Sequence, residues 1–212
     1  MSDEPSTGGP DHYFTARPAS DGEQQRLTVR LAGQDVEIVT ARGIFSPDGI
    51  DKGTRVLLDE VPEPPTRGTF LDLGCGWGPL ALTMALESPQ ATVHAVDVND
   101  RALDLARRNA QALGRTRVHV SRPEEVDPQI RFDLLWSNPP IRVGKQVLHE
   151  MLTTWLPRLA DGGTAYLVVQ KNLGSDSLQR WLQQTLPELM GQVEVTRTAS
   201  SKGFRILRVT RP

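Results

Sequence analysis

Hydrophobic residues recur along the chain in two patterns that predict different elements. Short, mostly apolar runs predict buried strands, and they cover residues 70–73, 92–96, 118–120, 132–136 and 165–169. Apolar residues at helical spacing predict helices, and they cover residues 80–86, 100–113, 145–159 and 175–186. Strands that alternate with such helices predict an α/β domain with a mostly parallel sheet covered on both faces.

Local signals set the expected boundaries of these elements. Asn99 and Ser175 are good N-cap residues for the helices that follow them. Residues 161–163, Asp-Gly-Gly, are expected to form a turn. These signals set where the helices at 100–113 and 175–186 begin and where a turn precedes the strand at 165–169.

The two ends of the chain carry antiparallel signals. Residues 27–39 contain two alternating runs around Ala-Gly-Gln and predict a β-hairpin that acts as a small cap or substrate lip. Residues 193–195 and 204–209 predict a closing antiparallel pair at the edge of the sheet. Residues 1–11 are polar without periodicity and are expected to be a disordered tail, which leaves residues 12–212 as one domain.

Composition excludes several classes of protein. The formal net charge of −2 over 212 residues argues against overall attraction to nucleic acid, so local basic patches must supply it. The single cysteine excludes an internal disulfide and a cysteine-cluster zinc site, and the four histidines show no metal-ligand spacing. No apolar stretch is long enough to span a membrane and the N-terminus does not resemble a signal peptide, so we expect a cytoplasmic protein without a metal.

The stretch FLDLGCGWG at 70–78 carries the first chemical signal. It predicts a strand, a tight turn built on Gly74, Gly76 and Gly78, and then a helix. Asp72 precedes the first glycine and would repel a pyrophosphate, which disfavours a dinucleotide. A cationic ligand without phosphate fits better, and the stretch looks like the first motif of class I methyltransferases that use S-adenosylmethionine (SAM).

Three further positions belong to the same expected cofactor site. Asp97 ends the next strand about twenty residues after the glycines, where an acid can accept hydrogen bonds from ribose hydroxyls, and Val98 follows it. Cys75 lies between two glycines and is expected to be a small apolar filler of the turn rather than a nucleophile.

Residues 137–140, Ser-Asn-Pro-Pro, follow the fourth strand directly and form the most specific motif of the chain. Pro139 and Pro140 remove two backbone donors and fix two φ angles, so the turn is rigid and rich in carbonyls. Asn138 and the Pro139 carbonyl can accept hydrogen bonds from an exocyclic amine whose lone pair is otherwise delocalised. The motif is similar to that of amino-methyltransferases.

Together these segments resemble the methyltransferase small domain family, in particular short relatives of the ribosomal RNA small-subunit guanine-N2 methyltransferases. The resemblance extends over most of the chain, from HYFTARP at 12–18 and GIFSPDGIDKGTRVLL at 43–58 to KGFRILR at 202–208. It implies a Rossmann-like class I fold with a seven-stranded sheet, SAM as donor, and a guanine amine in ribosomal RNA as acceptor.

The chain departs from the family pattern at two places. Position 141 is Ile141, where many amino-methyltransferases have an aromatic residue that stacks on the target base, so Phe45, Trp77 or Phe14 would have to stack instead. The third strand ends in SRPEE without the usual acid, and backbone groups near Ser121 and Arg122 would have to hold the adenine of SAM.

Basic residues suggest where RNA would bind. Arg142 and Lys145 follow the Asn-Pro-Pro turn and are placed to contact phosphates, although a solvated helix start explains them equally well. The C-terminal hairpin carries several cations against one acid, Glu194, and is either an RNA face or a charged edge strand that prevents aggregation.

We therefore interpret the chain as a SAM-dependent methyltransferase of guanine N2 in RNA, with Asn138, Pro139 and Pro140 as its catalytic motif. One alternative is another acceptor of the same chemistry, adenine N6 or a protein glutamine. A second is an RNA-binding module that retains SAM without activity, and a dehydrogenase is a distant third.

Overall fold

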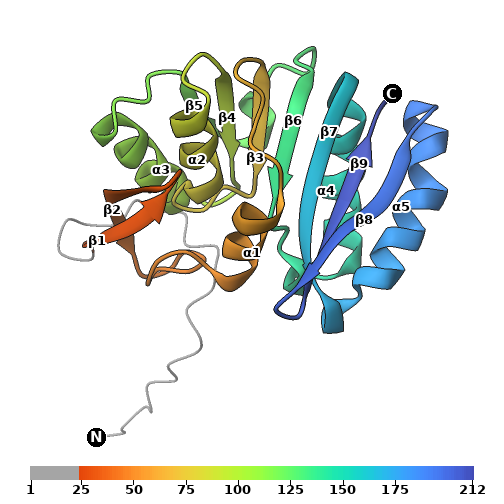
Figure 1. Ribbon diagram of the computed structural model, residues 1–212, viewed down its shortest axis with the longest axis horizontal. Coiled ribbons are helices and arrows are strands. Elements are labelled where there is room, and N and C mark those ends of the chain that lie inside the picture. The colour runs from red at the N-terminus through yellow and green to blue at the C-terminus, as the bar shows by residue number, and fades with distance from the viewer. Residues whose placement is uncertain (1–23) are drawn as a thin grey trace, which may run out of the picture.

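The computed structural model describes residues 24–212, with the side chain of Arg142 left out. The predicted tail at 1–11 and the aromatic candidate Phe14 lie outside the described residues. Figure 1 shows a sheet with helices on both faces and a separate two-stranded hairpin beside it. This is the predicted class I methyltransferase fold.

The sheet has seven strands in the order β5-β4-β3-β6-β7-β9-β8, and the hairpin is β1-β2. All neighbours from β5 to β7 are parallel, whereas β9 is antiparallel to both β7 and β8. The strands are β1 Gln24–Leu31, β2 Gln34–Ala41, β3 Thr69–Leu73, β4 Thr92–Val96, β5 Val118–Ser121, β6 Phe132–Ser137, β7 Leu159–Gln170, β8 Glu194–Ser201 and β9 Phe204–Thr210. The helices are α1 Lys52–Glu60, α2 Pro79–Glu87, α3 Asp100–Ala112, α4 Lys145–Trp155 and α5 Ser175–Met190.

Alternate residues of each central strand face opposite helix layers, as period two requires. Leu71 of β3 belongs to the core formed with α4 and α5, which lie behind the sheet in Figure 1. Its neighbour Phe70 belongs to the core formed with α1, α2 and α3 on the other face. Both residues have no exposed surface, so β3 lies at the centre of the domain.

The hairpin does not join the sheet but packs against α2 and α3 in a third small core that includes Leu31, Ile38 and Leu105. Asn109 of α3, which is 1% exposed, connects the hairpin to α3 and to the glycine turn before α2. Its amide accepts from the Val39 N–H at 2.7 Å and donates to the carbonyls of Val39 and Trp77, both at 3.0 Å. The hairpin is therefore fixed to the helix beneath it.

Three expected boundaries were wrong. The helix predicted over 145–159 ends at Trp155, because Pro157 cannot continue it, and a 3₁₀ turn leads directly into β7. The predicted turn at 161–163 is instead an irregular stretch of β7 beside β6, with Gly162 at φ +80°. Helix α5 is preceded by Gly174 in the left-handed region, so Ser175 is its first residue and not its cap.

Candidate functional site

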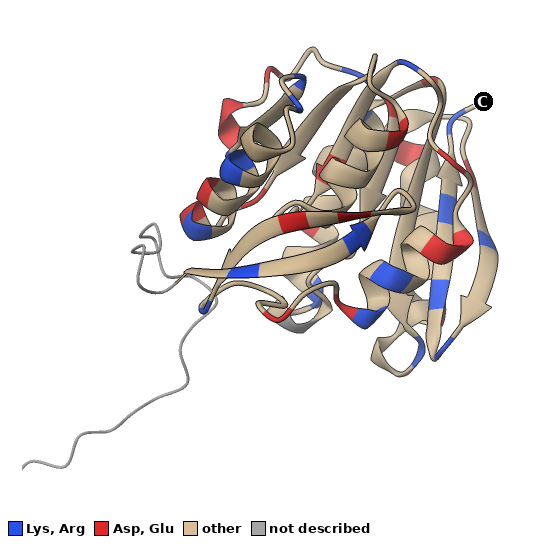
Figure 2. Cartoon of the chain, turned by 60° about the vertical axis from the view of Figure 1, so that its left-hand side comes forward, with Lys and Arg blue, Asp and Glu red and all other residues tan. Residues whose placement is uncertain are grey.

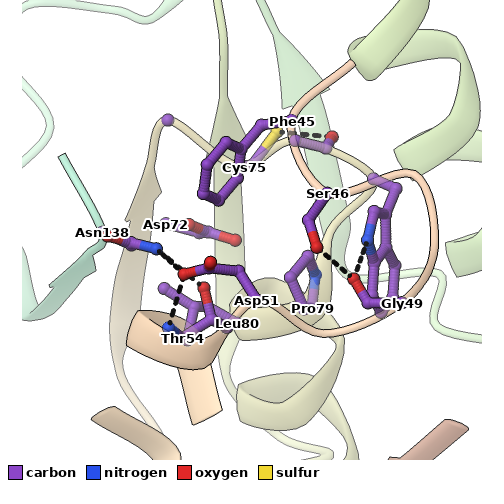
Figure 3. A pocket seen from close by; sticks show the side chains of 13 residues that line it. Phe45, Ser46, Gly49, Asp51, Thr54, Asp72, Cys75, Pro79, Leu80 and Asn138 are labelled. Carbon is purple, nitrogen blue, oxygen red and sulfur yellow. Dashed lines mark hydrogen bonds between the residues drawn. The ribbon is translucent and has the colours of Figure 1, made fainter. Parts of the chain in front are cut away.

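The carboxyl ends of β3, β4 and β6 bring the predicted site residues to one edge of the sheet. Figure 3 shows Asp72, Cys75 and Asn138 among the residues that line a cleft there. The loop before α1 closes the opposite side. The resulting cleft is lined by Phe45, Ser46, Gly49, Asp51, Thr54, Asp72, Gly74, Cys75, Gly76, Trp77, Pro79, Leu80 and Asn138. Chain segments far apart in sequence thus share one cleft, as parallel topology predicts.

The glycine turn has the geometry that its sequence predicts. Gly74, Gly76 and Gly78 have φ angles of +79°, +55° and +98°, where other residues are strained. A Cβ atom built at Gly74 or Gly76 would meet no atom within 4 Å, so open space lies against the bare backbone. Cys75 between them is 2% exposed, and burial raises the pKa of its thiol, which fits a packing role.

Asp72 is buried completely beneath the turn. One carboxylate oxygen accepts from the backbone N–H of Ala81 in α2 at 2.8 Å, and the other has no hydrogen-bond partner in the described part of the chain. Burial, with a smaller contribution from Asp97, raises the pKa of Asp72 to about 8. An unpartnered buried acid beside open space suits a cationic ligand, so the residues present fit SAM.

Asp97 connects the end of β4 to the glycine turn. Its Oδ2 accepts from Gly76 N–H and its Oδ1 from Asn99 N–H, both at 2.9 Å. Each oxygen keeps a lone pair that can accept from a ribose hydroxyl, so the protein contacts of Asp97 are compatible with the predicted ribose contact. Asn99 caps α3 as expected. Val98, which follows Asp97 in the chain, exposes 55% of its surface.

Arg122, expected near the adenine of SAM, lies outside the lining of the cleft. The backbone N–H of Arg122 donates to Glu125 Oε2 at 2.8 Å, and its guanidinium pairs with Asp100 at 2.7 Å. The Arg122 N–H is therefore already bonded within the protein. Val98 is exposed and likewise lies outside that lining.

Asn138 is held in one orientation by residues that the sequence did not identify. Its side-chain amide donates to Asp51 Oδ2 at 2.8 Å and to Thr54 Oγ1 at 3.1 Å (Figure 3). Asp51 caps α1 at the same time by accepting from the N–H groups of Gly53 and Thr54. Because the amide nitrogen is bonded to the protein, the oxygen of Asn138 is left as an acceptor.

The two prolines behave differently from one another. The Pro139 carbonyl accepts from the Ile141 N–H at 2.8 Å, which leaves it one lone pair for a substrate amine. The Pro140 carbonyl accepts from the Val143 N–H at 3.2 Å and so begins a short 3₁₀ turn. Ser137 Oγ donates to the Leu73 carbonyl at 2.7 Å, which ties the end of β6 to the end of β3.

Of the aromatic residues expected to stack on a base, Phe45 lines the cleft and is 44% exposed. The hypothesis for Trp77 was wrong, because its ring is 1% exposed beneath the hairpin and its Nε1 donates to the Gly49 carbonyl at 3.3 Å. Ile141 is partly buried against the core. Phe204 was missed: a Cβ atom built at Gly53 would lie 3.1 Å from its ring and 3.2 Å from the Asn138 amide nitrogen.

The basic residues of the C-terminal hairpin pair mainly with acids outside the hairpin, which the count within the hairpin did not include. Arg197 and Arg205 both pair with Asp176 of α5. The other pairs are Lys202 with Asp59 at 3.2 Å, Arg208 with Glu194 at 3.7 Å and Arg211 with Asp161 at 2.9 Å. Figure 2 likewise shows positive and negative residues interspersed. Lys145, in contrast, is exposed and has no ion pair among the described residues.

No group of histidine, cysteine or acidic residues within 24–212 could hold a metal ion. Over the same residues no helix is both long and apolar enough to cross a membrane.

The fold and the cleft together define a class I SAM-dependent methyltransferase. Comparison with known proteins agrees: residues 35–208 match the model of the methyltransferase small domain, and the chain belongs to that family. "Uncharacterized protein YbxB" of Bacillus subtilis is 33% identical over 93% of this chain and 97% of YbxB.

Other relatives are longer than this chain. Ribosomal RNA small subunit methyltransferase C of Pseudomonas entomophila is 30% identical over 95% of this chain, but the match spans 58% of that enzyme. The solved T. thermophilus 16S rRNA N2 methyltransferase, in complex with AdoMet and guanosine, superposes with a TM-score of 0.74 at 22% identity. That match spans 92% of this chain and 52% of the other, and it supports the fold.

Proposed function

We propose that this protein transfers a methyl group from SAM to the exocyclic N2 amine of a guanine in ribosomal RNA. The observation that carries the proposal is the orientation of Asn138. Its amide nitrogen is bonded to Asp51 and Thr54, so its oxygen is the group available to a substrate amine at the mouth of the cleft.

The residues of the chain would act by positioning. The lone pair of a guanine amine is delocalised into the ring, which makes the amine a poor nucleophile. Asn138 Oδ1 and the remaining lone pair of the Pro139 carbonyl would accept its two N–H groups and direct the nitrogen lone pair into the cleft. Such orientation can contribute roughly 7–11 kcal/mol to lowering a barrier.

The cofactor would lie along the opposite side of the same cleft. SAM supplies an electrophilic methyl group on a sulfonium. Asp72 would face its positive charge, Gly74, Cys75, Gly76 and Gly78 would let it approach the backbone, and Asp97 would bind its ribose beside the apolar surface of Val98.

Phe45 and the residues after the Asn-Pro-Pro turn would contact the RNA. Phe45 is the exposed aromatic residue in the cleft, and it would stack on a base that has been unstacked from its neighbours. Ile141, Arg142 and Lys145 follow the motif, and the two cations would contact flanking phosphates. The relatives that are named ribosomal RNA methyltransferases support RNA as the substrate.

The direct test is methylation of ribosomal RNA by the purified protein with labelled SAM, followed by identification of the modified nucleoside. We expect N2-methylguanosine. Asn138→Ala should lower single-turnover methyl transfer about 10²–10³-fold, because it removes an acceptor that matters most in the transition state. SAM affinity should barely change, since the glycine turn and Asp97 remain.

Asn172→Ala provides the matched control, because this exposed asparagine lies outside the cleft. A variant of Asn138 with normal turnover would remove that residue from the mechanism. Loss of SAM binding in the same variant would make its role structural. Methylation of adenine or protein, with guanine untouched, would replace the proposed substrate.

A further inference from the structure

The two carboxylate oxygens of Asp51 have different surroundings. Oδ2 accepts from Asn138 Nδ2 at 2.8 Å and from the backbone N–H groups of Gly53 and Thr54 at 2.7 and 3.3 Å. Oδ1 accepts from no group in the described part of the chain, and Asp51 lines the cleft (Figure 3). One oxygen is therefore committed to the protein and the other is available to a ligand.

The local sequence maintains this division. A Cβ atom at Gly53 would lie 3.0 Å from Asp51 Oδ2 and 3.2 Å from Asn138 Nδ2, so a side chain at this position would press on both groups. Glycine at 53 thus allows the carboxylate and the amide to meet over the start of α1. Asp51 and Asn138 both line the cleft, and each keeps one side-chain oxygen that has no hydrogen-bond partner among the described residues.

Guanine and adenine differ at the ring nitrogen beside their amine. In guanine the N2 amine adjoins N1–H, a donor, whereas in adenine the N6 amine adjoins N1, an acceptor. An ionised carboxylate can only accept hydrogen bonds, so it binds the first pattern and repels the second. Enzymes that read an unstacked base do so along this edge.

We propose that Asp51 selects guanine: its Oδ1 accepts from N1–H of the target base while its Oδ2 orients Asn138 toward the N2 amine. This inference rests on the proposed function and names the residue that determines its specificity. Asp51 then has two separable roles, reading the base and positioning the amide.

Two substitutions separate these roles. Asp51→Asn can keep an oxygen toward Asn138 and the helix start, but it presents an NH₂ donor to the base. Asp51→Ser keeps a good N-cap for α1 and is too short to reach Asn138. Asp48→Asn is the matched control, because it makes the same charge change on an exposed residue of the same loop that lies outside the cleft.

The assay incubates each protein with heat-unfolded ribosomal RNA fragments and labelled SAM and quantifies N2-methylguanosine and N6-methyladenosine. The wild type and the Asp48 variant should make N2-methylguanosine. Asp51→Ser should lower its rate about 10- to 100-fold, the loss expected for a charged hydrogen bond. Asp51→Asn should lower the guanine-to-adenine product ratio on the order of 100-fold, because the donor now matches adenine N1.

A second measurement does not depend on turnover. Exchange of the Asn138 side-chain amide protons, followed by NMR, should accelerate in Asp51→Ser and stay slow in Asp51→Asn. If the wild type makes N2-methylguanosine and both Asp51 variants keep its rate and selectivity, Asp51 does not read the base. If the wild type methylates no guanine, the proposed function itself fails and the inference ends with it.

Discussion

Asp72 provides the strongest test of how the buried centre of the sheet serves the cofactor. The perturbation is Asp72→Asn, which keeps the size of the side chain and an oxygen for the Ala81 N–H but removes the ionisable group. Burial raises the pKa of Asp72 from 3.8 to about 8. Each tenfold change in the ionisation equilibrium corresponds to about 1.4 kcal/mol. Ionising Asp72 in the folded protein therefore costs on the order of 5 kcal/mol more than in the unfolded chain.

The sign of the effect on stability follows from proton binding. Between pH 3.8 and about 8 the folded protein retains the proton on Asp72, whereas the unfolded chain releases it. The folded state thus binds more protons, and the contribution of this group to the free energy of unfolding falls as the pH rises through that window. Above about pH 8 both states are ionised and the loss levels off. The asparagine variant has no such dependence.

Urea unfolding of both proteins at pH 5, 7 and 9 measures the difference. The wild type should lose several kcal/mol relative to Asp72→Asn between pH 5 and 9, because only the wild type must ionise a buried acid. Calorimetry at pH 7 in two buffers of different ionisation enthalpy should show proton release when SAM binds the wild type, since a nearby cation lowers the pKa of the carboxyl. The variant should bind SAM roughly 10-fold more weakly, without proton release.

Two results would refute this reasoning. Parallel pH dependences of stability would mean that Asp72 is not the buried ionising group. SAM binding without proton release in the wild type, and with equal affinity in the variant, would mean that the unpartnered oxygen does not face the positive charge.

Further predictions concern three other regions. Asp97→Ala should weaken SAM binding by about 1.5–3 kcal/mol, measured by calorimetry, and NAD should bind poorly to every variant; unchanged SAM affinity would exclude the ribose contact. Reversing Arg142 and Lys145 to glutamate should weaken RNA binding and reduce its salt dependence without changing SAM affinity, and a flat salt dependence in the wild type would argue against phosphate contacts. Asn109→Ala should cost about 2–4 kcal/mol in denaturant unfolding, because it strands buried backbone groups of Val39 and Trp77; an unaltered midpoint would mean that the hairpin needs no such fixation.

The features predicted correctly from the sequence are those with local signals. The alternation of strands and helices predicted a mostly parallel sheet with helices on both faces. Asn99 caps the helix that follows it, and Gly76 adopts the positive φ that its turn requires, so both roles depend on neighbouring residues. The errors at Trp155 and Ser175 concern where helices stop and start, which neighbouring prolines and glycines decide.

The features that were missed depend on contacts between distant segments. Asp51 and Thr54 meet Asn138 across a sequence separation of more than eighty residues, and no periodic pattern records that contact. Trp77 looked available for stacking because the hairpin that covers it lies earlier in the chain. The pairing of Arg197 and Arg205 was missed because their acidic partner, Asp176, belongs to α5.

The segment between the hairpin and β3 explains why these missed contacts matter for activity. The proposed SAM side of the cleft is built from the ends of β3 and β4. The proposed substrate side comes instead from Phe45 and Asp51, which precede α1, and Trp77 anchors their loop through the Gly49 carbonyl. Because Asn109 fixes both the hairpin and Trp77, loosening the hairpin should impair selection of the base before it impairs binding of SAM. On the proposed function, specificity would therefore depend on residues that precede the sheet in the chain.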